Sequence, residues 1–242
     1  MPLRFKVIMR NITTEGLVFL SVLAKMSNFR QDFIRFAVSK SVLRFGEFKT
    51  RAGRLSPYFF NAGSFHDGES LLGLAQFYAK AILSAKIQFD MLFGPAYKGI
   101  PLVSGTAIAL AQIGHSVPFC FNRKEAKDHG EGGALIGAPL KGRVLIVDDV
   151  ISAGTSVRES VELLLANQAT PCGLAIALDR MERGGGELSA VQEIKLKFGL
   201  PVISIITLDD VLSYLQTREE LVHNLLAVQK YRQIYGVNAN AA

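Results

Sequence analysis

Short apolar runs alternate with longer segments of helical periodicity, and this alternation constrains the fold of the chain more than any other feature. The apolar or nearly apolar runs cover residues 89–93, 117–121, 144–147, 174–178 and 202–206. Apolar residues recur at helical spacing over residues 29–44, 71–85, 100–113 and 156–169. Strands that are apolar throughout are buried on both faces, so the pattern predicts an α/β fold with a central parallel sheet flanked by helices.

The two ends of the chain depart from this alternation. Residues 45–60 are rich in aromatic side chains and interrupted by glycine, which predicts a hairpin. The tail predicts further helices, because Thr207 and Asp210 have the spacing of a helix start. We interpret residues 26–242 as a single domain and the basic residues 1–25 as an extension outside the fold. A signal peptide and an organelle transit peptide are the alternatives for this extension.

The sequence has 27 basic and 21 acidic side chains, and its net charge of +6 favours an anionic partner such as nucleic acid, a membrane surface or a phosphorylated small molecule. Half of this excess lies in residues 1–25, so the remainder carries no unusual basic surface. No apolar run reaches the ~18 residues that span a bilayer. Two cysteines are too few for a disulfide scaffold. We therefore expect a cytoplasmic protein that binds neither nucleic acid nor membranes.

The apolar run 144–147 leads directly into Asp148 and Asp149, then into a loop of small and hydroxyl-bearing residues and a helix. Backbone N–H groups at a helix start, together with loop hydroxyls, form a cradle for a phosphate group. Adjacent carboxylates suit ribose hydroxyls or a hydrated Mg²⁺. A phosphorylated ribose satisfies both halves of this motif. Ser156 and Glu159 have capping-box spacing, which predicts the start of the helix.

Two further strand ends carry polar chemistry. Residues 122–133 hold three basic side chains, three acidic ones, His129 and three glycines. This composition predicts an exposed, mobile loop that could close over an anionic leaving group. The turn after residue 93 contains residues that permit close backbone approach, and it places Tyr97 and Lys98 at the mouth of the next helix. A solvated loop and an ordinary turn with a solvated lysine are the alternatives.

Residues 144–156 resemble the phosphoribosyl-diphosphate (PRPP) binding signature of the type I phosphoribosyltransferases, with a hydrophobic strand, an Asp-Asp pair and a small Gly-Thr loop. Residues 56–61 (SPYFFN), 93–101 (FGPAYKGIP) and 122–130 (NRKEAKDHG) resemble the orotate phosphoribosyltransferase family within that class. The resemblance covers roughly 90% of the chain, from residue 26 onward. It implies the type I phosphoribosyltransferase fold with a small N-terminal hood, and a homodimer whose subunits share lid residues.

The resemblance also implies the roles of individual side chains. The residues expected to bind PRPP are Arg51, Tyr97, Lys98, Arg123, Lys124, Lys127, His129, Asp148, Asp149, Val150, Ile151, Ser152, Ala153, Gly154, Thr155 and Ser156. Those with an implied catalytic role are Lys124, Lys127, His129, Asp148 and Asp149. Those expected to bind orotate are Phe59, Phe60, Ser152 and Arg180. Mg²⁺ is the implied cofactor, carried by PRPP rather than ligated directly by side chains. Arg51 stands where the family usually has lysine, and arginine is not equivalent to lysine at a tight phosphate site.

The reaction that the resemblance implies is transfer of ribose 5-phosphate from PRPP to N1 of orotate. It makes the chain a glycosyltransferase (pentosyltransferase) of de novo pyrimidine biosynthesis, forming orotidine 5′-monophosphate and diphosphate on the way to UMP. One alternative is a type I phosphoribosyltransferase for a purine base, from which Arg180 and the aromatic hairpin distinguish the chain. The other is a non-catalytic, PRPP-sensing regulator that binds nucleic acid, and such a protein could dispense with the basic residues of the lid.

Overall fold

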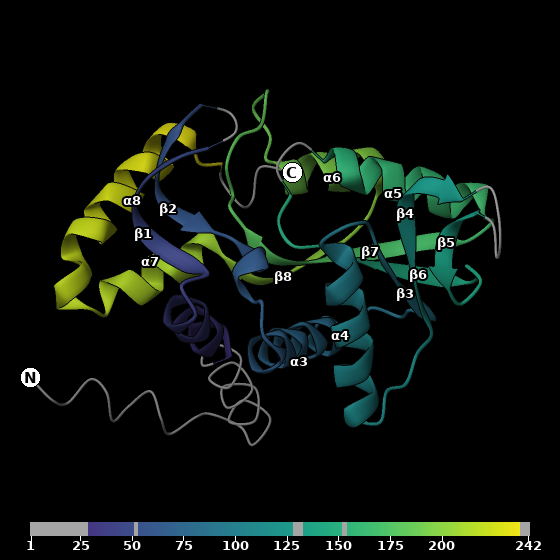
Figure 1. Ribbon diagram of the computed structural model, residues 1–242. Helices are drawn as coiled ribbons and strands as arrows, with labels where there is room; N and C mark the ends of the chain where they lie inside the picture. The colour runs from purple at the N-terminus through teal and green to yellow at the C-terminus, as the bar shows by residue number, and fades with distance from the viewer. Residues whose placement is uncertain (1–28, 51–52, 128–132, 152–153, 238–242) are drawn as a thin grey trace, which may run out of the picture.

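The computed structural model describes residues 29–50, 53–127, 133–151 and 154–237. Within these ranges the main sheet has six strands in the order β5-β4-β3-β6-β7-β8 (Figure 1). The strands are β3 (Met91–Gly94), β4 (Phe119–Lys127), β5 (Gly133–Gly137), β6 (Arg143–Val147), β7 (Thr170–Asp179) and β8 (Val202–Thr207). All neighbours pair in parallel except β5, which pairs antiparallel with β4 at the edge. The predicted parallel sheet is confirmed.

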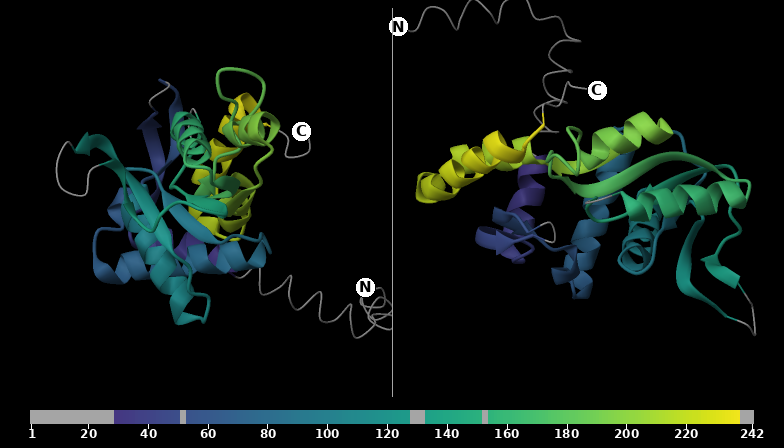
Figure 2. Two further views of the ribbon diagram at one scale, coloured as in Figure 1. Left: turned by 90° about the vertical axis from the view of Figure 1, so that its right-hand side faces the viewer. Right: turned by 90° about the horizontal axis from the view of Figure 1, so that it is seen from above.

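Helices cover both faces of this sheet (Figures 1 and 2). The labelled helices are α3 (Gly68–Ser84), α4 (Gly99–Gln112), α5 (Thr155–Ala166), α6 (Ala190–Phe198), α7 (Leu208–Gln216) and α8 (Val222–Tyr235). Helices α3 and α4 share one core with Leu145 and Val147 of β6, and α5 and α6 share the other with Val144 and Ile146. Strand β6 is apolar at each of these positions because successive side chains enter different cores.

The predicted N-terminal hairpin is present as β1 (Leu43–Lys49) and β2 (Leu55–Phe60), an antiparallel pair. It packs against α8 at one end of the sheet, and β5 forms the opposite end (Figure 1). The helix predicted over residues 29–44 covers only residues 29–39. It ends there because Ser41 adopts a left-handed φ of 55° and the chain then enters β1.

Of the two helix starts predicted from capping-box spacing, one is confirmed and one is wrong. Helix α7 begins as predicted, with a reciprocal capping box between Thr207 and Asp210. The capping box expected from Ser156 and Glu159 is wrong. Helix α5 begins directly after Gly154, whose φ is 67°. The hydroxyl of Ser156 donates to the carboxylate of Asp148 in the preceding loop instead of capping the helix.

Within the described ranges, no helix combines the length and the apolar character that crossing a membrane requires. Both cysteines are free thiols, Cys120 buried and Cys172 half-buried. Burial raises the pKa of the Cys172 thiol to about 11, so this thiol stays protonated near neutral pH.

Candidate active site

The carboxyl ends of β3, β4 and β6 open into a cavity of about 600 Å³. Ligands of open α/β sheets bind in this position, between neighbouring strands whose following helices cover opposite faces. Here those strands are β3 and β6, followed by α4 and α5. The residues that line the cavity are Phe93, Pro95, Ala96, Asn122, Lys124, Asp148, Val150, Ile151, Gly154, Thr155, Ser156, Val157, Glu159, Ser160 and Leu163.

The acidic pair after β6 is held by a set of short contacts. Asp148 is buried, and its carboxylate accepts hydrogen bonds from the backbone N–H of Asp149 (2.9 Å) and from Oγ of Ser156 (3.1 Å). Its backbone carbonyl accepts a hydrogen bond from the hydroxyl of Tyr78 on α3 (2.7 Å). The carboxylate of Asp149 lies 2.6 Å from Nζ of Lys98. The structure therefore brings four of the expected PRPP-binding residues together at one edge of the sheet: Lys98, Asp148, Asp149 and Ser156.

The carboxyl group of Asp148 has an unusual acidity. Burial, and then the negative charge of Asp149, raise its pKa to about 6, although the hydrogen bonds from Asp149 and Ser156 and the charge of Lys98 oppose this shift. An ordinary aspartate is fully ionised well below this pH. A ligand that brings hydroxyl donors to this edge favours the ionised carboxylate, so binding and ionisation are coupled.

The start of α5 is suited to an anion. Apart from its chain neighbours, a Cβ at Gly154 would meet no atom of the described residues within 4 Å, so the backbone here has room for a ligand. Thr155 and Ser156 follow in the first helical turn and line the cavity. First-turn N–H groups lack partners inside the helix and carry the positive end of its dipole, which attracts phosphate. Ser152 and Ala153, expected in the same loop, lie outside the described residues.

The turn between β3 and α4 is as tight as the sequence predicts. A Cβ on Gly94 would lie 2.2 Å from the carbonyl oxygen of Gly99, so the strand and the helix touch through their backbones. The backbone N–H of Ala96 donates to Oδ1 of Asn122 on β4 (2.8 Å), which ties the turn to the neighbouring strand. Asn122 also lines the cavity. Its role is not readable from the sequence, because a single asparagine at a strand end has no distinctive spacing.

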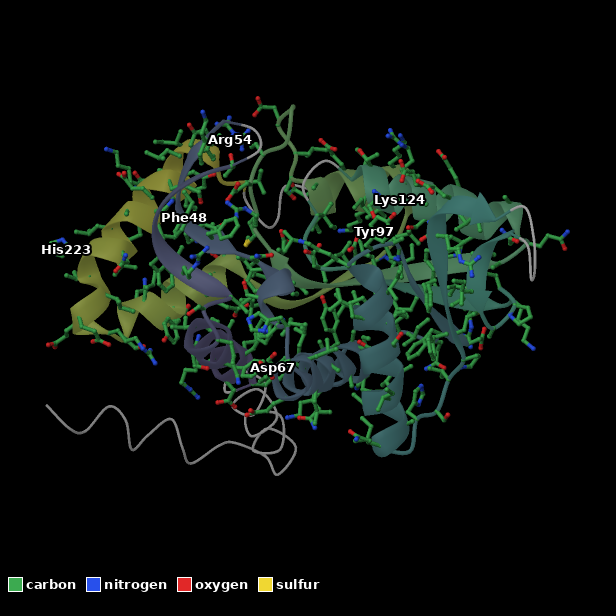
Figure 3. The ribbon with its side chains drawn as sticks, viewed as in Figure 1. Phe48, Arg54, Asp67, Tyr97, Lys124 and His223 are labelled. Atoms are coloured by element: carbon green, nitrogen blue, oxygen red, sulfur yellow. The ribbon has the colours of Figure 1, made fainter. Side chains whose placement is uncertain are left out.

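The segment predicted as a mobile loop over residues 122–133 is a strand in its first half. Arg123, Lys124 and Lys127 belong to β4, which pairs with β5. Lys124 lines the cavity, and its Nζ lies 5.3 Å from the ring centre of the exposed Tyr97 (Figure 3). The polar composition correctly predicts exposed side chains at Lys124 and Glu125, but it hides the strand because an edge ribbon needs few apolar residues. His129 lies outside the described residues.

Arg180 follows β7 and lies in a polar cluster beside the hairpin, not in the wall of the cavity. Its Nη2 lies 2.8 Å from Oε1 of Glu182 and donates to Oγ of Ser56 (3.2 Å). Its guanidinium carbon lies 4.4 Å from the ring centre of Tyr58. Burial opposes the charge of Arg180, but Tyr58 and Glu182 raise its pKa overall, so the guanidinium stays charged.

The two phenylalanines expected to pack against a base lie on opposite faces of β2. Phe60 is buried in the core beside Phe33, with ring centres 6.4 Å apart. Phe59 is half-buried on the other face and stacks on Phe48 at 5.4 Å. Both stay predicted base contacts, and Phe60 shares its face of β2 with Tyr58, the ring that lies against Arg180. Arg51, in the turn of the hairpin, lies outside the described residues.

The chain is similar to several proteins of known type. The orotate phosphoribosyltransferase of Nitrosospira multiformis is 69% identical over 210 residues, which are 87% of this chain and 92% of that protein. That of Laribacter hongkongensis is 69% identical over 212 residues, 88% of this chain and 100% of that protein. The crystal structure of the orotate phosphoribosyltransferase of Francisella tularensis matches with a TM-score of 0.77 and 38% identity, covering 84% of this chain and 98% of that one.

A family model described as "Phosphoribosyl transferase domain" matches residues 61–197, which include every residue that lines the cavity. Fold and site together define a phosphoribosyl transferase domain of the type I fold, with a central parallel sheet and a small hairpin. Within that class, the chain belongs to the orotate phosphoribosyltransferase family. The expected fold and enzyme class, a pentosyltransferase, are confirmed.

Proposed function

We propose that this enzyme transfers ribose 5-phosphate from PRPP to N1 of orotate. One observation carries the proposal: a single cavity joins the Asp148 loop to the first turn of α5, in a chain 69% identical to a named orotate phosphoribosyltransferase. Asp148 and Asp149 accept hydrogen bonds from the ribose hydroxyls. Thr155, Ser156 and the N–H groups of the first turn bind the 5′-phosphate, with Val150, Ile151, Ser152, Ala153 and Gly154 completing the loop.

The reaction breaks the bond from C1 of the ribose to the diphosphate oxygen and forms the bond from C1 to N1 of orotate. Positive charge develops on the ribose ring while the diphosphate gains negative charge. Lys98 and Lys124 hold fixed positive charge for the leaving group, an electrostatic contribution of about 3 kcal/mol per well-placed donor in comparable sites. Tyr97 lies beneath Lys124 and keeps its ammonium near the cavity. Orotate is already an anion, so no strong general base is needed.

Further contacts to the diphosphate come from Arg51, Arg123, Lys127 and His129. We propose that the segment carrying the last three closes over the site and excludes water, which would otherwise hydrolyse the activated ribose. Some of these side chains act in the partner's site of a homodimer. Strand pairing of β4 with β5 supports this arrangement, because Lys127 pairs with Gly133 in a ribbon at the edge of the sheet.

Arg180 is the proposed partner of the orotate carboxylate, together with Ser152, and Phe59 and Phe60 pack beside the base. The guanidinium supplies a permanent positive charge and N–H donors, both of which suit a carboxylate. Its permanent charge and its fixed position beside Glu182 and Ser56 support this role.

Mg²⁺ fits the donor set as an ion that arrives with PRPP. The oxygen atoms of Asp148 and Asp149 already accept from Ser156 and Lys98, so water-mediated contact with a hydrated Mg²⁺ is more favourable than direct ligation. Among the described residues, no group of three or more His, Cys, Asp or Glu side chains is arranged to hold a metal ion. When bound, the ion would neutralise part of the diphosphate charge.

For the rest of the chain, we propose one domain over residues 26–242, with residues 1–25 as an extension to it. Two continuous cores that share β6 support a single domain. Two free cysteines, one of them buried, fit a reducing cytoplasmic compartment. We propose no role for nucleic acid or membranes.

The test is a direct assay of the full chain with PRPP, Mg²⁺ and either orotate, hypoxanthine or adenine. We expect consumption of orotate with formation of orotidine 5′-monophosphate, and no turnover of the purines. Folded protein that consumes a purine but not orotate would refute the proposal. Lys127→Ala then tests the closing segment, since unchanged turnover would remove it from the mechanism.

A further inference from the structure

The carboxylate of Glu182, beside Arg180, accepts hydrogen bonds from three segments of the fold. Oε1 of Glu182 accepts hydrogen bonds from Nε of Arg180 (3.0 Å) and from the hydroxyl of Tyr58 on β2 (2.8 Å). Oε2 accepts one from the hydroxyl of Tyr231 on α8 (3.1 Å). The side chain of Glu182 is only 12% exposed, so water competes little for these bonds.

Glu182 is fixed independently of Arg180. Both tyrosines remain donors near neutral pH, because burial raises the pKa of Tyr58 and that of Tyr231. The backbone of Glu182 also forms an antiparallel bridge with Gly236, just past the end of α8. The carboxylate is therefore a rigid anchor between the hairpin, the strand end after β7 and the C-terminal helix.

This anchor determines the position of a flexible side chain. Glu182 and Ser56 engage Nε and Nη2 of Arg180, and the ring of Tyr58 supports the plane of the guanidinium. Arginine has five N–H donors, so these contacts leave donor capacity on Nη1 for an incoming carboxylate. Without the anchor, a long arginine side chain samples many rotamers and must be ordered when the ligand binds.

We propose that Glu182, held by Tyr58 and Tyr231, is the positioning residue that orients Arg180 toward the carboxylate of the acceptor base. Helix α8, remote in sequence from the cavity, is thereby part of the specificity site. The inference rests on the proposed role of Arg180 in binding orotate, and it adds the residues through which the rest of the fold sets that role.

Steady-state kinetics of the full chain test this inference. Glu182→Gln keeps the size of the side chain but removes the charge that pairs with Arg180. We expect the KM for orotate to rise about tenfold, with the KM for PRPP changed less than about twofold. Tyr231→Phe should shift the KM for orotate in the same direction by a smaller factor. Glu187→Gln is the matched control, because this carboxylate lies on the same segment and is 91% exposed.

A double-mutant cycle separates positioning from stability. In an Arg180→Ala background, Glu182→Gln should not raise the KM for orotate further, since nothing remains to be positioned. Glu182→Gln and Tyr231→Phe that raise both KM values equally, or lower only the melting temperature, would overturn the inference. If Arg180→Ala raises the KM for orotate while neither variant does, the inference alone fails. If Arg180→Ala leaves that KM unchanged, the proposed role of Arg180 fails and the inference with it.

Discussion

The hydroxyl of Tyr78 donates to the backbone carbonyl of Asp148 over 2.7 Å, from a ring that is fully buried on α3. Helix α3 belongs to the core on the face opposite α5. The bond therefore ties the acidic loop to a helix that has no side chain among the described residues lining the cavity. Burial raises the pKa of Tyr78, so its hydroxyl stays protonated and available as a donor.

Tyr78→Phe should loosen this loop while leaving the ring in place. The buried carbonyl of Asp148 loses a partner, and we expect a loss of about 1–2 kcal/mol in the free energy of unfolding. The KM for PRPP should rise several-fold, with little change in the KM for orotate. Urea denaturation and steady-state kinetics measure both effects. Tyr235→Phe, which removes a hydroxyl from α8, is the control, and equal effects of the two variants on the KM for PRPP would contradict the prediction.

Asp148→Asn tests the raised carboxyl pKa. This pKa is about 6 in the folded protein and 3.8 without the fold, so the native state binds the proton more tightly. Stability of the unsubstituted protein therefore falls as pH rises through this window, and the variant lacks that loss. Between about pH 5 and about pH 8, the variant should lose about 1 kcal/mol less than the unsubstituted protein. Urea denaturation at several pH values measures this difference. If the free energy of unfolding changes with pH by the same amount in both proteins, the raised pKa is contradicted.

Lys98→Gln tests whether the positive charge of Lys98 serves turnover rather than the stability of the fold. The side chain of Lys98 is 56% exposed, so its pair with Asp149 contributes at most about 0.5 kcal/mol and the melting temperature should hardly change. Turnover should fall about 100-fold, because the leaving diphosphate loses a fixed charge. Since Lys98 lowers the pKa of Asp148, the acid limb of the activity profile should move to higher pH. The exposed Lys141→Gln is the control and should change neither quantity.

Gly94→Ala and Gly154→Ala compare two costs of adding a Cβ to a glycine: a collision with neighbouring atoms and an unfavourable backbone conformation. A Cβ at Gly94 would collide with the backbone of Gly99 at 2.2 Å, and we expect a loss of about 3 kcal/mol or more in stability. A Cβ at Gly154 meets open space, and only its φ of 67° carries a cost, about 1 kcal/mol. Denaturant midpoints rank the two variants. A larger loss for Gly154→Ala would mean that β3 and α4 separate more easily than their contact indicates.

The parts of the fold that the sequence predicts are those whose signal is local. Strand β6 reads as a strand because each residue of 144–147 is buried in one core or the other. Strand β5 is absent from the prediction because Gly133–Gly137 is short, glycine-bounded and paired to a polar partner. Helix α6 is likewise absent, since its nine residues hold four charged or amide side chains and only two buried positions.

The candidate site divides in the same way. The sequence predicts Asp148, Asp149 and Gly154 as site residues, because a strand, an acid pair and a glycine follow one another within a single segment. Tyr58 and Glu182 are not predicted, since 124 residues separate them and their contact exists only in the folded chain. The different surroundings of Phe59 and Phe60 cannot be predicted from the sequence either, since neighbours on a strand face opposite ways and only the fold shows that Phe60 faces the core.

Strands β3 and β6 are neighbours, yet the helices that follow them leave toward opposite faces. The space between them therefore results from the order in which strands and helices are connected. It requires no gap in the packing of either core. Substitutions in the hairpin and α8, which lie at one end of the sheet, could therefore change which acceptor base the enzyme prefers. On the proposed roles, the part of the site that binds the sugar phosphate follows from the order of the strands, whereas the part that selects the base depends on elements added at the end of the sheet.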